Sequence, residues 1–198
     1  MTKRLIPLVL LVILGLPLVY QSTPTEVLKL KTFDALIPEQ EPSGYFTVLN
    51  ITEDDINREG GYPLPRQRLA EINIQLKKKG ALGIGWVVAY PQPDRFGGDE
   101  TFKQSLADIP SVLAMFEGDN ALYPNTTGTV ILGEDVGGIT ATGVIQNIDL
   151  FKETSQQGIA VARTEVDSLV RRLPLLLRTP DGWVPAYGTE VLKILVGA

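Results

Sequence analysis

The sequence contains neither cysteine nor histidine. The lack of cysteine excludes a disulfide, a thiolate nucleophile and a metal site with cysteine ligands. The lack of histidine excludes a Ser-His-Asp triad, a zinc site with histidine ligands and a pH switch based on imidazole. Any catalysis by this chain would therefore depend on a pair of carboxylates or on a metal ion bound by carboxylates.

Positive charge is also scarce, because 18 basic residues stand against 23 acidic ones and the formal net charge is −5. Lys3 and Arg4 are the only charged residues among the first 25, and subtracting these two charges leaves −7 for the rest of the chain. An acidic body argues against a nucleic-acid partner. With 198 residues, of which 44% are hydrophobic, the chain has the length and composition of one globular domain.

One long uncharged run, residues 5–20, follows the two basic residues. It is longer than the core of a typical signal peptide and slightly shorter than the roughly 20 residues of a membrane-spanning helix. The polar residues 21–25 would complete a crossing, and the exit lacks the small residues of a cleavage site. The interpretations left open are an uncleaved anchor, a cleaved signal peptide and a buried core segment. In the first two, Lys3 and Arg4 hold the N-terminus in the cytoplasm and the body lies outside it.

Residues 66–79 carry the clearest helical pattern of the body. Leu69, Ile72 and Leu76 recur at the spacing of one helix face. Pro65 suits the start of a helix because its missing N–H group would have no partner there. The sequence therefore predicts a helix with one apolar face.

The segments on either side of this helix favour strands. Residues 45–51 are rich in β-forming side chains, and residues 81–90 are an uncharged run that predicts a strand buried on both faces. A strand, a helix and a buried strand in succession predict a βαβ unit with a parallel pair.

Shorter elements complete the expected fold. Further helices are expected over residues 27–36, 100–107 (capped by Asp99) and 189–196 (starting at a capping-type Thr189). Further strands are expected over residues 111–116, 129–132, 142–147, 158–163 and 168–177. Asp181-Gly182 is a strong turn signal between residues 173–178 and 183–187. The expected fold class is α/β, with a mixed, largely parallel central sheet, flanking helices and an N-terminal transmembrane or signal helix.

Four motifs occur along the body in a fixed order. They are residues 51–56 (ITEDDI), residues 62–66 (YPLPR), residues 81–87 (ALGIGWV) and residues 167–175 (DSLVRRLPL), the last followed by a turn at residues 180–182. This order resembles the CHASE2 domain, an extracytoplasmic sensory module of bacterial signalling proteins, and the resemblance covers about residues 45–196. The family counterparts are of the types I-D-x-x-S-L, W-P-W-P-R, A-x-x-I-G-F-D and D-G-V-V-R-R-x-P-L.

The chain departs from the family pattern at the two positions where that pattern has acids. Thr52 follows the first expected strand, and Val87 ends the buried one. Tyr62 and Leu64 stand at the two aromatic positions around the first proline. If the family acids bind a ligand or an ion, this chain has lost both, and its recognition is altered or absent.

The resemblance implies a domain plan and a set of partners. Residues 1–22 are expected to be a signal anchor or signal peptide, residues 23–44 a connector and residues 45–198 the sensory domain. The expected partners are the membrane through the N-terminal helix, an unknown small ligand or envelope protein, and a second copy in a homodimer. No cofactor, metal or catalytic residue is expected. Because family members continue into membrane helices and an output domain, this chain is expected to be either a fragment or a free-standing form.

The acidic candidates for ligand binding, Asp54, Asp55, Asp94 and Asp99, follow expected strands, at the edge where open α/β sheets bind ligands. The other candidates are Arg66 at a helix start, Trp86 in the expected buried strand and Arg171 on a later expected strand. Each also has a structural interpretation. The acids would cap helices or form turns, and Trp86 would pack in the core. Arg66 would pair with an internal carboxylate such as Asp55, and Arg171 would pair with Asp167 or a neighbouring acid.

Three functions are compatible with these residues. The leading hypothesis is a non-enzymatic sensor, and the second is an anchored module that binds another envelope protein. The third is a carboxylate-dependent hydrolase that uses Asp54 or Asp55 with Asp94 or Asp99. A pocket lined with buried charge would favour the sensor, whereas a filled sheet edge with an exposed apolar patch would favour the interaction module.

Overall fold

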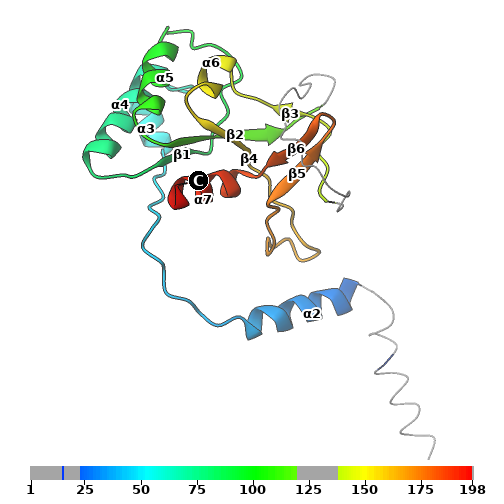
Figure 1. Cartoon of the computed structure of the whole chain (residues 1–198). Coiled ribbons are helices and arrows are strands. Elements are labelled where there is room, and N and C mark those ends of the chain that lie inside the picture. The colour runs from blue at the N-terminus through cyan, green and yellow to red at the C-terminus, as the bar shows by residue number, and fades with distance from the viewer. Residues whose placement is uncertain (1–14, 16–22, 120–137, 198) are drawn as a thin grey trace, which may run out of the picture. The chain divides into compact units, whose positions relative to one another are not determined.

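The computed structural model describes residues 15, 23–119 and 138–197 (Figure 1). The chain divides into two compact units, of which unit 1 comprises Met1–Leu49 and Arg163–Arg171, and unit 2 comprises Asn50–Ala162 and Arg172–Ala198. The expected anchor, apart from Gly15, and the expected strand at residues 129–132 lie outside the described residues. Among the helices that the structure describes, none is both long enough and apolar enough to cross a membrane.

Unit 2 is built on a four-stranded sheet around the buried strand β2 (Ser111–Glu117). β1 (Ile84–Trp86) and β4 (Gln156–Ile159) pair with β2 in parallel, and the short β3 (Val144–Ile145) pairs with its end antiparallel. Helix α5 (Asp99–Ala107) connects β1 to β2, so these three elements form a parallel βαβ unit. The expected α/β class with a mixed, largely parallel sheet is confirmed.

Helices cover both faces of this sheet (Figure 1). On one face, Ile84 and Trp86 of β1 pack with Leu69 of α4 (Arg66–Lys78) and Phe102 of α5. Four aromatic rings, those of Trp86, Tyr90, Phe102 and Phe151, meet edge to face there with centroids 5.3–6.1 Å apart. Phe151 comes from the short helix α6 (Asp149–Lys152), so the aromatic cluster joins β1 to α5 and α6.

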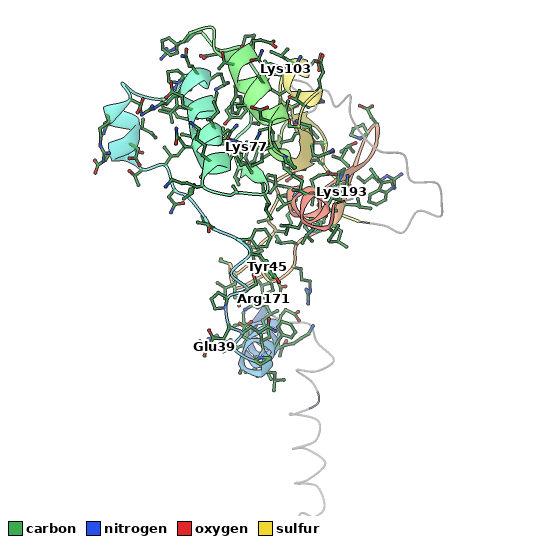
Figure 2. All side chains as sticks on the ribbon, turned by 60° about the vertical axis from the view of Figure 1, so that its left-hand side comes forward. Glu39, Tyr45, Lys77, Lys103, Arg171 and Lys193 are labelled. Atoms are coloured by element: carbon green, nitrogen blue, oxygen red, sulfur yellow. The ribbon has the colours of Figure 1, made fainter. Side chains whose placement is uncertain are left out.

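Helix α7 (Tyr187–Val196) covers the opposite face, and two glycines permit its close approach. A Cβ atom at Gly85 would lie 2.2 Å from the Tyr187 hydroxyl, and one at Gly158 would lie 2.6 Å from the Tyr187 Cα. Lys193 on α7 (Figure 2) pairs with the buried Glu190 of the same helix, with Nζ 3.0 Å from Oε2. The one buried acid of α7 is therefore neutralised within the helix.

A hairpin of β5 (Leu176–Thr179) and β6 (Gly182–Pro185) completes unit 2. Its turn falls at Pro180 and Asp181, so the hairpin predicted from the turn signal is confirmed. Leu177 and Val184 of the hairpin share a second core cluster with residues of β2 and β4. The remaining helices are α2 (Thr23–Leu36) in unit 1 and α3 (Glu53–Arg58) in unit 2.

The predicted strand at residues 45–51 is wrong. This segment has no regular structure, and Tyr45 and Val48 are 81% and 84% exposed (Figure 2 labels Tyr45). β-forming side chains stabilise a strand only where a neighbouring strand and a core receive them. The predicted βαβ unit through α4 is therefore replaced by the one through α5.

Other boundaries also differ from the sequence predictions. Only Ile84–Trp86 of the run at residues 81–90 forms a strand, and the exposed side chains of Leu82 and Val87 show that the run is not buried on both faces. Most of residues 168–177, including both arginines, lies outside any strand, and the strand begins only at Leu176. The expected helix caps at Asp99 and Thr189 are instead Gly98 and Ala186.

Candidate functional site

Arg66 begins α4 at the edge of the sheet where β1 ends. The N-cap residue Pro65 makes no side-chain hydrogen bond to the helix, and the backbone N–H of Arg66 donates instead to Asp94 Oδ2 at 2.9 Å. Asp94 also accepts the backbone N–H groups of Phe96 and Gly98, at 3.1 and 3.3 Å. Burial opposes ionisation of Asp94, but these three hydrogen bonds and the Arg66 charge outweigh it, so its pKa lies below the ordinary value. Asp94 therefore acts as the cap of α4.

The Arg66 side chain is buried between an acid and an aromatic ring. Its Nε lies 3.6 Å from Asp99 Oδ1, and its guanidinium lies 4.1 Å from the centre of the Tyr90 ring. Neither Arg66 Nε nor Asp99 Oδ1 has a hydrogen-bond partner, and the other Asp99 oxygen accepts the N–H of Asp94 at 2.8 Å. Burial raises the pKa of Tyr90, which stays protonated. The acid that pairs with Arg66 is thus Asp99 rather than Asp55.

Trp86 belongs to a buried polar chain that the sequence analysis missed. Its Nε1–H donates to Asn73 Oδ1 at 3.0 Å, and Asn73 Nδ2 donates to Ser105 Oγ at 3.0 Å. The Ser105 hydroxyl donates in turn to the Phe102 carbonyl at 2.7 Å. The sequence did carry a signal, because Asn73 interrupts the apolar face of α4 between Leu69 and Leu76.

Asn147 is a second buried amide without a place in the sequence analysis. Its Oδ1 accepts the backbone N–H of Tyr90 at 2.7 Å, and its Nδ2 donates to the Ala114 carbonyl at 3.1 Å and to Gln157. It therefore ties the segment after β1 to β2 and β4 and shapes the same sheet edge.

Asp54 and Asp55 lie in the first turn of α3. Thr52, which stands where the family pattern has an acid, is the N-cap of this helix. Its backbone N–H donates to Asp55 Oδ2 at 2.9 Å, and its hydroxyl accepts the Asp55 N–H at 3.3 Å. Hydrogen bonds from Thr52 lower the pKa of Asp55, which also pairs with Arg58 at 3.4 Å. Thr52 and Asp55 thus form a capping box.

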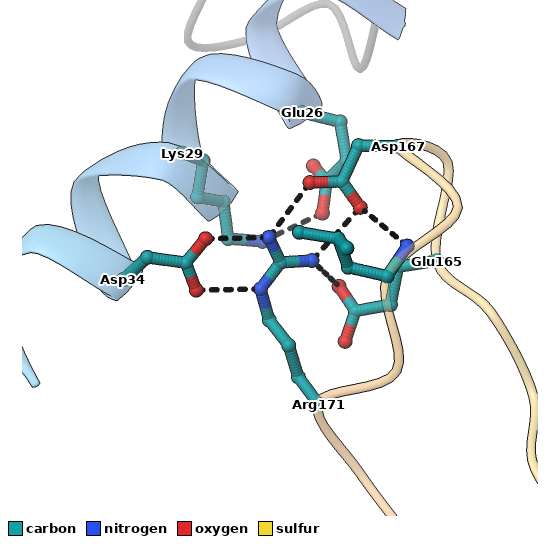
Figure 3. Close-up of polar contacts among 7 residues, drawn as sticks. Glu26, Lys29, Asp34, Glu165, Asp167 and Arg171 are labelled. Carbon is teal, nitrogen blue, oxygen red and sulfur yellow. Dashed lines mark hydrogen bonds and ion pairs between the residues drawn. The ribbon is translucent and has the colours of Figure 1, made fainter.

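Arg171 lies in unit 1, in a cluster of acids (Figure 3). Its Nε and Nη2 donate to the two oxygens of Asp34 at 2.7 and 2.6 Å. Its Nη1 and Nη2 donate to the two oxygens of Asp167 at 2.8 and 2.7 Å, and Glu165 lies 3.9 Å away. The expected pair with Asp167 is confirmed, and Asp34 of α2 is an additional partner. Hydrogen bonds from Arg171 lower the pKa of Asp34 and bring that of Asp167 to about 2.

The segment that carries Arg171 is a tight turn. The Glu165 N–H donates to the Leu169 carbonyl at 2.9 Å, and the Leu169 N–H donates to Asp167 Oδ1 at 3.3 Å. Ser168 has a φ of 64°, in the left-handed region that favours glycine. The CHASE2 motif has glycine at this position, and glycine adopts such a φ without strain.

The structure thus groups three of the seven candidate residues and separates the others. Arg66, Asp94 and Asp99 lie together at the start of α4, Trp86 belongs to the Asn73 chain, and Asp54 and Asp55 lie in the first turn of α3. Arg171 lies in the other unit. Among the described residues, no group of three or more acids is arranged to hold a metal ion.

These features define an α/β domain whose charged groups at the sheet edge are turned toward each other and toward the backbone. The family model of the CHASE2 domain matches residues 8–196, nearly the whole chain, and the protein belongs to this family. CHASE2 domains are extracytoplasmic sensory domains rather than catalytic ones. Neither the search of curated proteins nor the search of solved structures found a match.

Proposed function

We propose that this chain is the extracytoplasmic sensory part of a membrane-anchored signalling protein and has no enzymatic activity. The observation that carries the proposal is the CHASE2 match over residues 8–196. The uncharged residues 5–20 after Lys3 and Arg4 support the anchor. A signal from outside the cytoplasm would favour one of two arrangements of the domain. The segment that follows the proposed anchor would transmit this change in arrangement to the membrane.

Within this proposal, the Arg66–Asp94–Asp99 cluster is the site where a small polar ligand acts. Its support is the pair of buried atoms without hydrogen-bond partners, Arg66 Nε and Asp99 Oδ1. Buried polar atoms in native proteins nearly always have hydrogen-bond partners. A ligand with an acceptor for Arg66 Nε and a donor for Asp99 Oδ1 would therefore be stabilised here.

A second candidate function is an interaction module without a small ligand. Unit 1 exposes large apolar side chains over much of its described length. Those of α2 and the following segment are 50% to 84% exposed and comprise Leu28, Phe33, Leu36, Ile37, Tyr45, Phe46, Val48 and Leu49. Exposed apolar surface of this kind is typical of a contact with another protein, such as an envelope protein or a second copy.

Fractionation of host cells tests the proposal. An antibody against residues 66–79 would follow the protein through carbonate washing of membranes and through protease treatment of spheroplasts. We expect it to stay with the washed membranes and to be degraded by external protease. A protein that is washed off, or that protease reaches only after lysis, would contradict an anchored extracytoplasmic domain.

The apparent mass of the same band separates the two candidate functions. A band well above 21.6 kDa would identify the chain as the input end of a larger receptor. A band near 21.6 kDa in the membrane fraction would identify a free-standing anchored domain. That result would exclude one-chain signalling across the membrane and would favour the interaction module.

A further inference from the structure

We infer that Arg171 forms a latch that holds α2 in its helical form, and that opening of this latch is how a conformational change reaches the segment next to the proposed anchor. The latch is the set of hydrogen bonds from Arg171 to Asp34 and Asp167 (Figure 3). Its biological meaning rests on the proposed sensory function, whereas its geometry does not depend on that function.

Helix α2 has little else to stabilise it. It spans 14 residues, a length at which an isolated helix is marginal in water, and Leu30 is the one buried residue among them. Its last turn contains Asp34 and no basic residue, although the negative end of the helix dipole favours cations. Arg171 supplies that missing cation from a distant part of the chain.

One cation serves all the acids of the latch. The guanidinium uses three nitrogens to reach both Asp34 and Asp167, with Glu165 beside them, and its side chain is only 7% exposed. A planar fork of donors suits two carboxylates at once, which a lysine ammonium does not. Without Arg171, these acids would repel one another, and α2 would lose its contact with the turn.

The latch is connected through the chain to the sheet of unit 2 on one side and to the proposed anchor on the other. Segment Arg163–Arg171 begins four residues after the end of β4 at Ile159 and ends five residues before β5 at Leu176. Helix α2 begins at Thr23, directly after the proposed anchor. A displacement of β4 or β5 would therefore move the turn that carries Arg171. This movement would form or break the hydrogen bonds to Asp34, and α2 would become ordered or disordered with them.

Hydrogen exchange of the full chain in detergent micelles, followed by mass spectrometry, tests the latch. We expect R171Q to accelerate exchange of the α2 peptides by about tenfold, since charge-assisted hydrogen bonds of this kind are worth at least that factor. R171K should lie between R171Q and the parent. The matched control K31Q removes an exposed cation from the same helix and should leave exchange of α2 unchanged.

Tryptophan emission shows whether unit 2 remains folded, because Trp86 and Trp183 both lie in that unit. Unchanged α2 exchange in R171Q would overturn the latch. If R171Q loses its native emission, the D34N variant provides the test instead. D34N removes the ion pair between Arg171 and Asp34 and leaves the pair of Arg171 and Asp167. Faster exchange confined to α2 in D34N would support the latch, and parental exchange would overturn it. A failure of the proposed function would show instead in the fractionation experiment.

Discussion

Ser168 illustrates how one residue can work against the turn that contains it. Its φ of 64° costs a residue with a Cβ atom about 1 kcal/mol or more, and glycine avoids that strain. We expect S168G to slow hydrogen exchange of peptides from residues 163–171 by about threefold, after allowance for the greater freedom of glycine in the unfolded chain. S168V should accelerate the same exchange, since β-branched residues avoid this conformation. Faster exchange in S168G would contradict the strain argument.

The acids of the latch predict its behaviour at low pH. Because Arg171 holds the pKa of Asp34 and Asp167 below the ordinary value, their contribution to stability is complete above about pH 4. It is lost as the pH falls through about 2, where Asp167 becomes protonated. The chain has no cysteine, so spin labels can be placed at the exposed sites L28C and L169C. The distance distribution should be narrow at pH 7 and pH 4 and broad below pH 2. Broadening between pH 6 and pH 4 would contradict this prediction.

Asn73 is the centre of a buried network, and its loss should be costly. N73A would leave the Trp86 indole N–H and the Ser105 hydroxyl without one partner each. Buried polar groups without partners cost about 1–3 kcal/mol, so we expect a loss of about 3 kcal/mol in the free energy of unfolding. Urea unfolding followed by tryptophan emission measures it. Q75A, at an exposed position of the same helix, is the control and should change the value by less than about 0.5 kcal/mol.

At the scale of elements, the packing of α7 on the sheet makes a sharp prediction about two glycines. G158A would place a methyl group against the backbone of Tyr187. A backbone cannot move aside by rotation, as a flexible side chain can. We expect a loss of about 2–3 kcal/mol in the free energy of unfolding, the upper part of the range for overpacked core sites. Gly188 lies within α7 with open space around it, so G188A should be neutral or up to about 1 kcal/mol stabilising. Equal unfolding midpoints for the two variants would contradict the close approach of α7.

The longer helices were predictable from the sequence because their signals are local, whereas the short helices α3 and α6 were not predicted. The apolar periodicity of α4 and the turn before β6 each occupy a few consecutive residues, and both appear where expected. Strands depend on partners elsewhere in the chain. The β-forming residues 45–51 pair with no strand that the structure describes, and their own pattern could not reveal this. The run at residues 81–90 likewise contains only three residues of strand.

In the candidate sites, too, partners that are close in sequence could be predicted and distant partners could not. Asp167 is four residues from Arg171, so their pairing could be predicted from spacing. Asp34 is 137 residues away in sequence, and Asp99 is 33 positions from Arg66, so neither partner could be recognised without the fold. The loop that brings Asp94 and Asp99 to α4 was identified, but its role as the cap of that helix depends on the tertiary structure.

At the scale of the whole molecule, unit 1 is discontinuous, because it combines the N-terminal segment with nine residues from late in the chain. This arrangement has a consequence for biosynthesis. A ribosome adds about 5–20 residues per second, so the 137 positions between Asp34 and Arg171 take about 7–27 seconds to make. Throughout that interval α2 lacks the cation at its C-terminal end, and a helix of 14 residues is marginal without further support. The nascent chain therefore presents α2 as an unsupported helix until Arg171 has been synthesised, so this part of unit 1 becomes ordered only after most of unit 2 has been made.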